Sequence, residues 1–217
     1  MIKFLIDFVL HMDVHLNEII TNYGTWTYGI LFFVIFMETG FVVTPFLPGD
    51  SLLFAAGTFA ALGSLNPYYL FGLLSVAAVL GDTINYSIGA YIGERAFSGN
   101  IKLLKQEHLE RTQKFYEKHG GKTIILARFI PIIRTFAPFV AGVGTMKYSR
   151  FITYNVVGGI AWVAIFTFLG YFFGNIPFVK KHFELVIFAI IFISFIPPVL
   201  EVFKARREAK GAVVELE

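Results

Sequence analysis

The 217-residue sequence contains no cysteine, which excludes disulfide bonds, thiolate catalysis, iron–sulfur clusters and cysteine-based zinc sites. Charged residues are also scarce: they make up 15% of the chain, against roughly 25% in a typical soluble domain. Hydrophobic residues make up 56%, and 26 residues are Phe. A composition this apolar excludes a disordered chain and an ordinary soluble enzyme, and it predicts a polytopic membrane protein.

The sequence motifs of common enzyme and cofactor sites are missing too. There is no G-x-S-x-G, H-E-x-x-H or P-loop sequence, and no histidine falls within an expected span. His11 and His15 have the spacing of metal ligands on a helix, but without a third ligand a solvated polar stripe is the better interpretation. We therefore expect no enzyme activity, no metal and no cofactor. The net charge is +3, and the basic residues are clustered in a few segments of the chain. Such clusters are typical of the signal that orients a membrane protein, rather than of a nucleic-acid-binding surface.

Hydropathy divides the chain into an ordered series of segments. These are an amphipathic interfacial helix at 1–22, a first repeat at 23–93, a basic loop at 94–122, a second repeat at 123–174, a last span within 175–203 and a tail at 204–217. The expected full spans, about four, are 25–47, 68–93, 151–173 and 185–203. The final seven residues, GAVVELE, look like an appended tail and carry no expectation.

Each repeat contains a break between apolar stretches. Pro48 and Gly49 interrupt the first repeat, and Pro131 and Pro138 interrupt the second. The arm at 51–62 has about 12 residues and reaches only ~18 Å, too short to cross a core of ~30 Å. We therefore expect a re-entrant hairpin in each repeat.

Matched landmarks of the two repeats recur at offsets of 83, 85 and 81 residues. One full span, 68–93, separates the two hairpins, so they should enter from opposite faces. This arrangement is an all-α inverted repeat, as in many secondary transporters, with the site at the midplane. The G-x-x-x-G sequences at 89–93 and 170–174 predict close helix packing.

The basic loop and the basic tail are separated by two expected spans, so both should lie on one side of the membrane. The excess of Lys and Arg makes that side cytoplasmic. The span 25–47 then places the N-terminus on the cytoplasmic side as well.

Five ionisable residues lie in apolar surroundings, where each isolated charge costs roughly 2.5–3.5 kcal/mol. They are Glu38, Asp50, Asp82, Arg128 and Arg134. The arginines flank Pro131, and a break there would let both bind one phosphate, for which the guanidinium fork is well suited. The alternative is that the arginines only neutralise Glu38 and Asp50.

The acidic residues have different expected roles. Burial disfavours a charged carboxyl and a nearby arginine favours it, so Glu38 is the best candidate for proton exchange, with a permanent salt bridge as the alternative. Asp50 either joins this exchange or caps the helical arm at 51–62. Asp82 and Asn85 share a helix face and would support the site or act as hydrogen-bonding links between helices.

These residues carry a family resemblance. The segment 121–142, with Arg128, Pro131 and Arg134, resembles the hallmark of the DedA family (SNARE-associated or VTT domain), and so do Glu38 with Leu47-Pro48-Gly49-Asp50, and Gly81-Asp82 with Tyr86 and Gly89. The resemblance covers roughly residues 20–200. Ala90 departs from it, because many members have arginine at the matching position.

The resemblance implies a multi-pass protein of the bacterial inner membrane that moves lipids between leaflets. Members are implicated in returning undecaprenyl phosphate to the cytoplasmic face with the help of the proton motive force. The two acids and two arginines that members need match Glu38, Asp50, Arg128 and Arg134. Related eukaryotic VTT proteins resemble phospholipid scramblases.

The expected function is therefore transport of an anionic lipid, coupled to protons. The arginines would hold the phosphate, and Glu38 and Asp50 would exchange protons. Two alternatives remain: a gradient-independent phospholipid scramblase, and a structural membrane protein whose charges only stabilise the fold. A homo-oligomer is left open.

Overall fold

The computed structural model describes residues 12–41, 49–97, 120–144 and 146–182, together with 185, 186, 189 and 192. Within these residues the regular structure is helical, which confirms the expected all-α class. The helices are α2 (Met12–Tyr23), α3 (Trp26–Gly40), α4 (Gly49–Ala61), α5 (Pro67–Phe97), α7 (Lys122–Ala127), α8 (Pro131–Val143), α9 (Tyr148–Phe173) and α10 (Pro177–Lys181).

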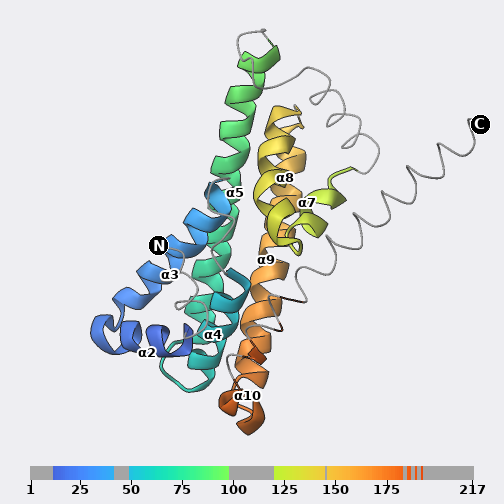
Figure 1. Cartoon of the computed structure of the whole chain (residues 1–217). Coiled ribbons are helices and arrows are strands. Elements are labelled where there is room, and N and C mark those ends of the chain that lie inside the picture. Colours follow the sequence, from blue (N-terminus) through green and yellow to red (C-terminus); the bar gives the residue numbers. More distant parts are fainter. Residues whose placement is uncertain are drawn as a thin grey trace, which may run out of the picture.

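Two long helices form the centre of the molecule. In the described part of the chain, Pro67–Gly93 of α5 and Tyr148–Phe173 of α9 are long and apolar enough to cross a membrane. They correspond to the expected spans 68–93 and 151–173. The two helices run in opposite directions, so that the start of α5 and the end of α9 lie at the same end of the molecule (Figure 1).

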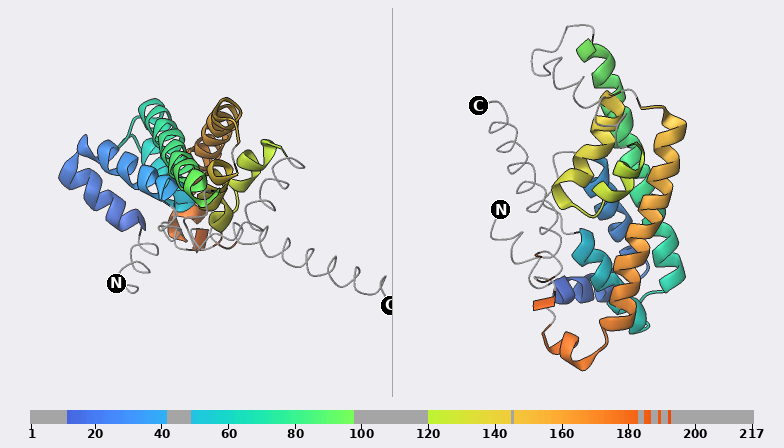
Figure 2. Two further views of the ribbon diagram at one scale, coloured as in Figure 1. Left: turned by 90° about the horizontal axis from the view of Figure 1, so that it is seen from above. Right: turned by 90° about the vertical axis from the view of Figure 1, so that its right-hand side faces the viewer.

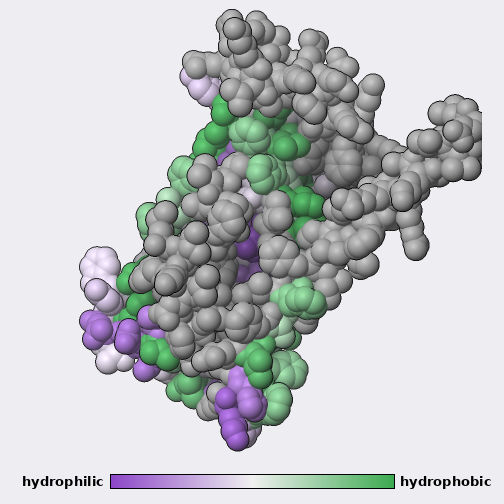
Figure 3. All heavy atoms as spheres, viewed as in Figure 1, coloured by the Kyte–Doolittle hydropathy of each residue, from purple (hydrophilic) through white to green (hydrophobic). Residues whose placement is uncertain are grey.

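The exposed side of α5 is apolar at four-residue spacing. Val76, Leu80, Ile84 and Ile88 are each at least 36% exposed and follow one another on one helix face. Figure 3 shows hydrophobic residues over much of the described surface, with hydrophilic residues at the lower end over α2 and α10 and in a smaller area near the centre. An apolar face of this kind, on a helix of spanning length, is suited to contact with lipid.

The helix expected to span at 25–47 is shorter in the structure. α3 has 15 residues, which corresponds to ~22 Å, and the chain becomes extended at Phe41. Residues 42–48, which include Pro48, lie outside the described residues. So do residues 98–119 of the expected basic loop, most of the expected last span at 185–203, and both ends of the chain at 1–11 and 193–217.

α3 and α4 form a helical hairpin. At its open end, the backbone N–H of Asn66 donates a hydrogen bond to the Tyr28 hydroxyl at 2.6 Å. At its tip, the backbone N–H of Gly49 donates to Glu38 Oε1 at 3.1 Å. α4 therefore returns to the end of the molecule where α3 begins.

The local sequence explains where α5 starts. The Asn66 Oδ1 atom accepts hydrogen bonds from the backbone N–H groups of Tyr68 and Tyr69, at 3.0 and 3.2 Å. An asparagine cap followed by proline in the first helical position is a favoured helix start, because proline lacks an N–H that would have no partner there.

α7 and α8 form a second hairpin around residues 128–130. Pro131 begins α8, as expected of a break at this position. Pro138 was also expected to break the helix, but α8 continues through it to Val143. Proline removes one hydrogen bond from the helix, and the close packing of α8 against α5 described below compensates for that loss.

Glycines allow α4 to pack closely on α9. A side-chain carbon at Gly57 would overlap the carbonyl oxygen of Thr167, and one at Gly170 would overlap the carbonyl oxygen of Phe54. Gly170 begins the second G-x-x-x-G sequence, so the expected packing role of that motif is confirmed.

The same type of contact joins α8 to α5. A side-chain carbon at Gly142 would overlap the carbonyl oxygen of Tyr86, and one at Gly89 would overlap that of Phe139. Each contact residue of α8 lies 85 positions after its counterpart on α4, and each contact residue of α9 lies 81 positions after its counterpart on α5. Because α5 and α9 are antiparallel, α4 and α8 lie toward opposite ends of the molecule (Figures 1 and 2).

Helix α2 packs against the rest of the molecule through one face. Leu16 is 2% exposed and belongs to the same apolar core as Leu31 and Leu53. Asn17 and Glu18 are exposed on the other side. The apolar side of this amphipathic helix therefore packs against the protein core.

Candidate functional site

The tips of the two hairpins meet at Arg134, in the first turns of α8. Its guanidinium group forms two ion pairs: Nη2 with Glu38 Oε1, and Nη1 with Asp50 Oδ1 at 2.5 Å. All three residues are buried, and Glu38 is completely inaccessible. Helices α3, α4 and α8 thus each contribute one charged group to this cluster.

Trp162 of α9 completes the cluster. Its indole Nε1–H donates a hydrogen bond to Asp50 Oδ1 at 2.8 Å. The Arg134 guanidinium lies 5.1 Å from the centre of the indole ring, within range of a cation–π interaction. Sequence reasoning missed this residue. The signal was available, because the N–H of a tryptophan buried in an apolar span needs an acceptor.

Glu38 also lies against the start of α4. Its Oε1 atom accepts the Gly49 N–H, whereas its Oε2 atom is buried without a hydrogen-bond partner. A side-chain carbon at Gly49 would overlap Oε2. Only glycine leaves room for the carboxylate at this position.

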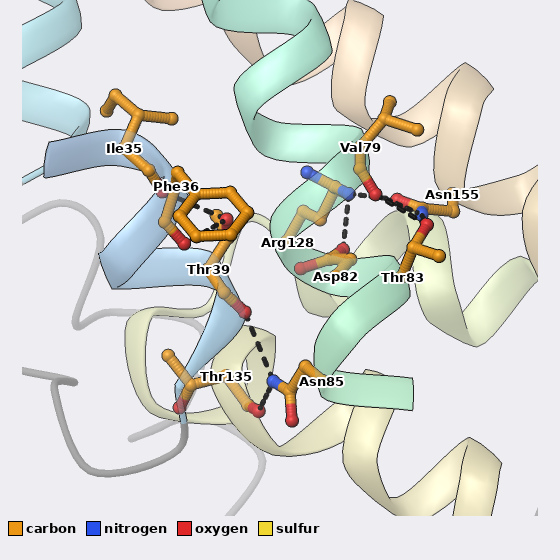
Figure 4. Close-up of polar contacts among 10 residues, drawn as sticks. All are labelled: Ile35, Phe36, Thr39, Val79, Asp82, Thr83, Asn85, Arg128, Thr135 and Asn155. Atoms are coloured by element: carbon orange, nitrogen blue, oxygen red, sulfur yellow. Dashed lines mark hydrogen bonds and ion pairs between the residues drawn. The ribbon is translucent and has the colours of Figure 1, made fainter. Parts of the chain in front are cut away.

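Arg128 forms a second cluster, shown in Figure 4. Its guanidinium group contacts Asp82 of α5 and the side-chain oxygen of Asn155 of α9. The Asn155 Nδ2 atom in turn donates to the Val79 carbonyl oxygen at 3.0 Å and to Thr83 Oγ1 at 3.2 Å. Arg128 is 3% exposed, so this cluster is as deeply buried as the first. Sequence reasoning did not identify Asn155.

Asn85 connects α5 to both hairpins. Its Nδ2 atom donates to the carbonyl oxygen of Thr39, near the end of α3, at 3.1 Å, and to that of Thr135 in α8, at 2.7 Å (Figure 4). These hydrogen bonds hold the two tips at the same level of α5. The supporting role expected for Asn85 stays a prediction.

The structure brings all five expected charges into ion pairs, but it divides them between the two arginines instead of gathering both arginines at one anion. Arg134 binds Glu38 and Asp50, and Arg128 binds Asp82. The two guanidinium groups therefore bind separate carboxylates in this conformation.

The two clusters are electrostatic neighbours. Asp82 lies close enough to interact with both Glu38 and Arg134 as well as with Arg128. When all five groups are ionised, three carboxylates and two guanidinium groups leave a net charge of −1. Burying an uncompensated charge is costly, and a single proton would neutralise the set.

Among the described residues, no group of three His, Cys, Asp or Glu side chains could hold a metal ion. The charged groups of the site are three carboxylates and two guanidinium groups.

The described helices define an all-helical membrane protein, and comparison with known proteins gives its family. Residues 47–172 match the VTT domain. The chain is 54% identical over 215 residues to Protein DedA of Escherichia coli strain K12, covering 98% of both chains. It is 42% identical over 185 residues to an uncharacterized membrane protein of Mycobacterium leprae, covering 84% of this chain and 83% of the relative.

Inner membrane protein YghB of Escherichia coli strain K12 is 32% identical over 177 residues, covering 81% of this chain and 78% of the relative. No solved structure matches the chain. The chain belongs to the DedA family of VTT-domain membrane proteins, which confirms the resemblance noted in the sequence.

Proposed function

We propose that this chain is a lipid transporter of the bacterial inner membrane, which couples protons to the movement of undecaprenyl phosphate between leaflets. The observation that carries the proposal is the buried set of three carboxyl and two guanidinium groups where the hairpin tips meet. Ionisable groups inside a membrane mark substrate or proton pathways.

The proposed membrane arrangement is an inverted repeat. The α3–α4 and α7–α8 hairpins enter from opposite faces as re-entrant elements, and α5 and α9 are two of three spans, the third being the expected span at 185–203. The glycine contacts that recur between α4 and α9 and between α8 and α5 support this symmetry. In transporters of this plan, the substrate binds near the midplane, where broken helices begin.

The charge balance links anion binding to protons. A phosphate monoester carries about −1.5 to −2 charges at pH 7, so its entry would add to the net charge of −1. Protonation of Glu38 or Asp50 makes this set of five groups neutral before the phosphate enters. It also frees part of the Arg134 guanidinium group for hydrogen bonds to the phosphate. The arginines then bind the phosphate with charge-assisted hydrogen bonds. When the carboxyl group loses its proton to the opposite side of the membrane, its restored negative charge favours release of the phosphate.

The orientation follows from the basic segments. The excess of Lys and Arg in 94–122 and 204–217 places both segments in the cytoplasm. Because the α3–α4 hairpin returns to its starting end, α5 alone separates α2 from the basic loop. We therefore propose that α2 is on the periplasmic side, in contrast to the expectation based on a full span at 25–47.

Reconstituted protein tests the proposal. Proteoliposomes would contain undecaprenyl phosphate or phosphatidylglycerol, with and without a pH gradient across the membrane. We expect gradient-dependent movement of the polyprenyl lipid alone, and its loss in Glu38→Gln at normal expression. Movement of both lipids without a gradient would identify a scramblase, and movement of neither lipid by folded protein would favour the structural role.

A further inference from the structure

We infer that the first turn of α4, residues 49–51, binds the phosphate group, and that the Glu38 carboxylate occupies this phosphate position in the conformation described here. The inference rests on the proposed function and specifies its binding site. In this mechanism, the carboxylate and the phosphate exchange places.

The starting point is the set of donors around one carboxylate oxygen. Glu38 Oε1 accepts a hydrogen bond from the backbone N–H of Gly49, at the N-terminus of α4, and pairs with Arg134 Nη2. α4 has 13 residues, so its start has the unpaired N–H groups and the partial positive charge of a full helix terminus. A helix start combined with an arginine fork is a chemical environment that suits phosphate.

The side chain of Glu38 is an independent indication that this position binds an anion. Glu38 is completely buried, it points into the start of α4, and its Oε2 atom has no hydrogen-bond partner. The absence of a side chain at Gly49 provides the space for this carboxylate. The position therefore already holds an oxyanion supplied by the chain itself.

A carboxylate leaves some nearby donors unused. The Nε atom of Arg134 is buried without a partner, and so is the hydroxyl of Ser51 in the same first turn of α4. A carboxylate has two oxygens, whereas a terminal phosphate has three strong acceptors. Phosphate can satisfy donors that Glu38 does not.

Exchange requires that Glu38 lose its charge or move. The charged groups that face it are Arg134 on α8, Asp50 on α4 and Asp82 on α5. Asp82 in turn pairs with Arg128, which directly follows α7. From α9, the neutral Trp162 contacts both Asp50 and Arg134. Protonated Glu38 no longer competes with phosphate for Arg134, so proton uptake and phosphate entry occur together.

The intrinsic fluorescence of Trp162 provides a direct measurement of binding. The chain has two tryptophans, and Trp26 is 78% exposed on α3. In a Trp26→Phe background, the emission of Trp162 reports on the Arg134 cluster alone. The full-length protein in detergent would be titrated with farnesyl phosphate, inorganic phosphate and farnesol at pH 7.5.

Two substitutions of Glu38 separate exchange from simple charge repulsion. Glu38→Gln removes the charge but leaves a side chain in the phosphate position, whereas Glu38→Ala also empties it. We expect Glu38→Ala to bind farnesyl phosphate at least about tenfold more tightly than the parent, with Glu38→Gln in between. Equal affinity of the two variants, or no gain in either, would overturn the exchange.

A serine pair provides a second test with little risk to folding. Ser51 and Ser75 both have buried hydroxyls without partners, but Ser75 lies in α5, about two turns before Asp82. In the Glu38→Ala background, we expect Ser51→Ala to weaken binding of farnesyl phosphate about fivefold and Ser75→Ala to leave it unchanged. An equal change in affinity for farnesyl phosphate in the two serine variants would overturn the placement of phosphate at the first turn of α4.

The three ligands distinguish the inference from the proposed function. Tighter binding of farnesyl phosphate than of inorganic phosphate supports both. Equal binding of the two phosphates supports the phosphate position but contradicts a lipid substrate. Equal binding of farnesol and farnesyl phosphate shows that the phosphate group is not recognised and overturns the inference.

Discussion

The indole N–H of Trp162, in the middle of α9, donates a 2.8 Å hydrogen bond to Asp50, in the first turn of α4. This bond connects one of the two long spans to the tip of the first hairpin. Arg134 lies against the same indole ring and pairs with the same carboxylate oxygen. Trp162 therefore orients both members of the ion pair on which the proposed phosphate chemistry depends.

The first prediction concerns this hydrogen bond. Trp162→Phe keeps an aromatic face for Arg134 but removes the donor to Asp50. A hydrogen bond to a charged group contributes about 1.5–3 kcal/mol, so we expect lipid-phosphate transport to fall about tenfold or more. Trp26→Phe, on the exposed surface, is the control and should transport like the parent. Normal transport by Trp162→Phe would show that the indole N–H is dispensable.

The second prediction separates structural from transport roles of Arg128. Arg128→Ala leaves Asp82 buried without its charged partner, and breaking a buried pair costs about 3–5 kcal/mol. We expect a large loss of thermal stability, much of which returns in the double variant Arg128→Ala/Asp82→Ala. Transport should stay absent in the double variant, because Arg128 is no longer present to bind the phosphate. A stable double variant that transports normally would assign this pair to the structural role alone.

Part of this arrangement could be predicted from the sequence. The spans in α5 and α9 follow from long apolar runs, and the buried charges stand out because each is isolated among apolar neighbours. Which arginine binds which acid could not be predicted. Arg134 and Glu38 are 96 positions apart, and their contact depends on how two hairpins meet, which no local pattern encodes.

Two differences have specific physical causes. Pro138 was expected to break α8, but close packing against Gly89 of α5 holds the helix together despite the missing hydrogen bond. The apolar run at 25–47 has the length of a span, yet α3 ends at Gly40. Near that end, the carbonyl oxygen of Thr39 accepts a hydrogen bond from the Asn85 side chain of α5. A tertiary contact of this kind overrides what composition suggests.

The third prediction tests the glycine contacts. Gly170→Ala places a side-chain carbon against the carbonyl oxygen of Phe54, and Gly89→Ala places one against that of Phe139. Overpacking of this kind costs about 1–3 kcal/mol, so both variants should unfold at lower temperature in a thermal assay. Gly72→Ala, also in α5, meets nothing within 4 Å and should be neutral or stabilising. A similar response at all three positions would contradict close packing at Gly89 and Gly170.

The fourth prediction concerns orientation, and the absence of native cysteine makes it directly measurable. Single cysteines at Glu18, Ser64 and Lys147, all exposed, can be labelled in intact cells with a membrane-impermeant maleimide. The α3–α4 hairpin returns to its starting end, so Glu18→Cys and Ser64→Cys should both react from the periplasm. Lys147→Cys follows α8 and should react only after the cells are opened. Labelling of Ser64→Cys but not of Glu18→Cys in intact cells would mean that the segment 25–47 crosses the membrane after all, and the N-terminus would then be cytoplasmic.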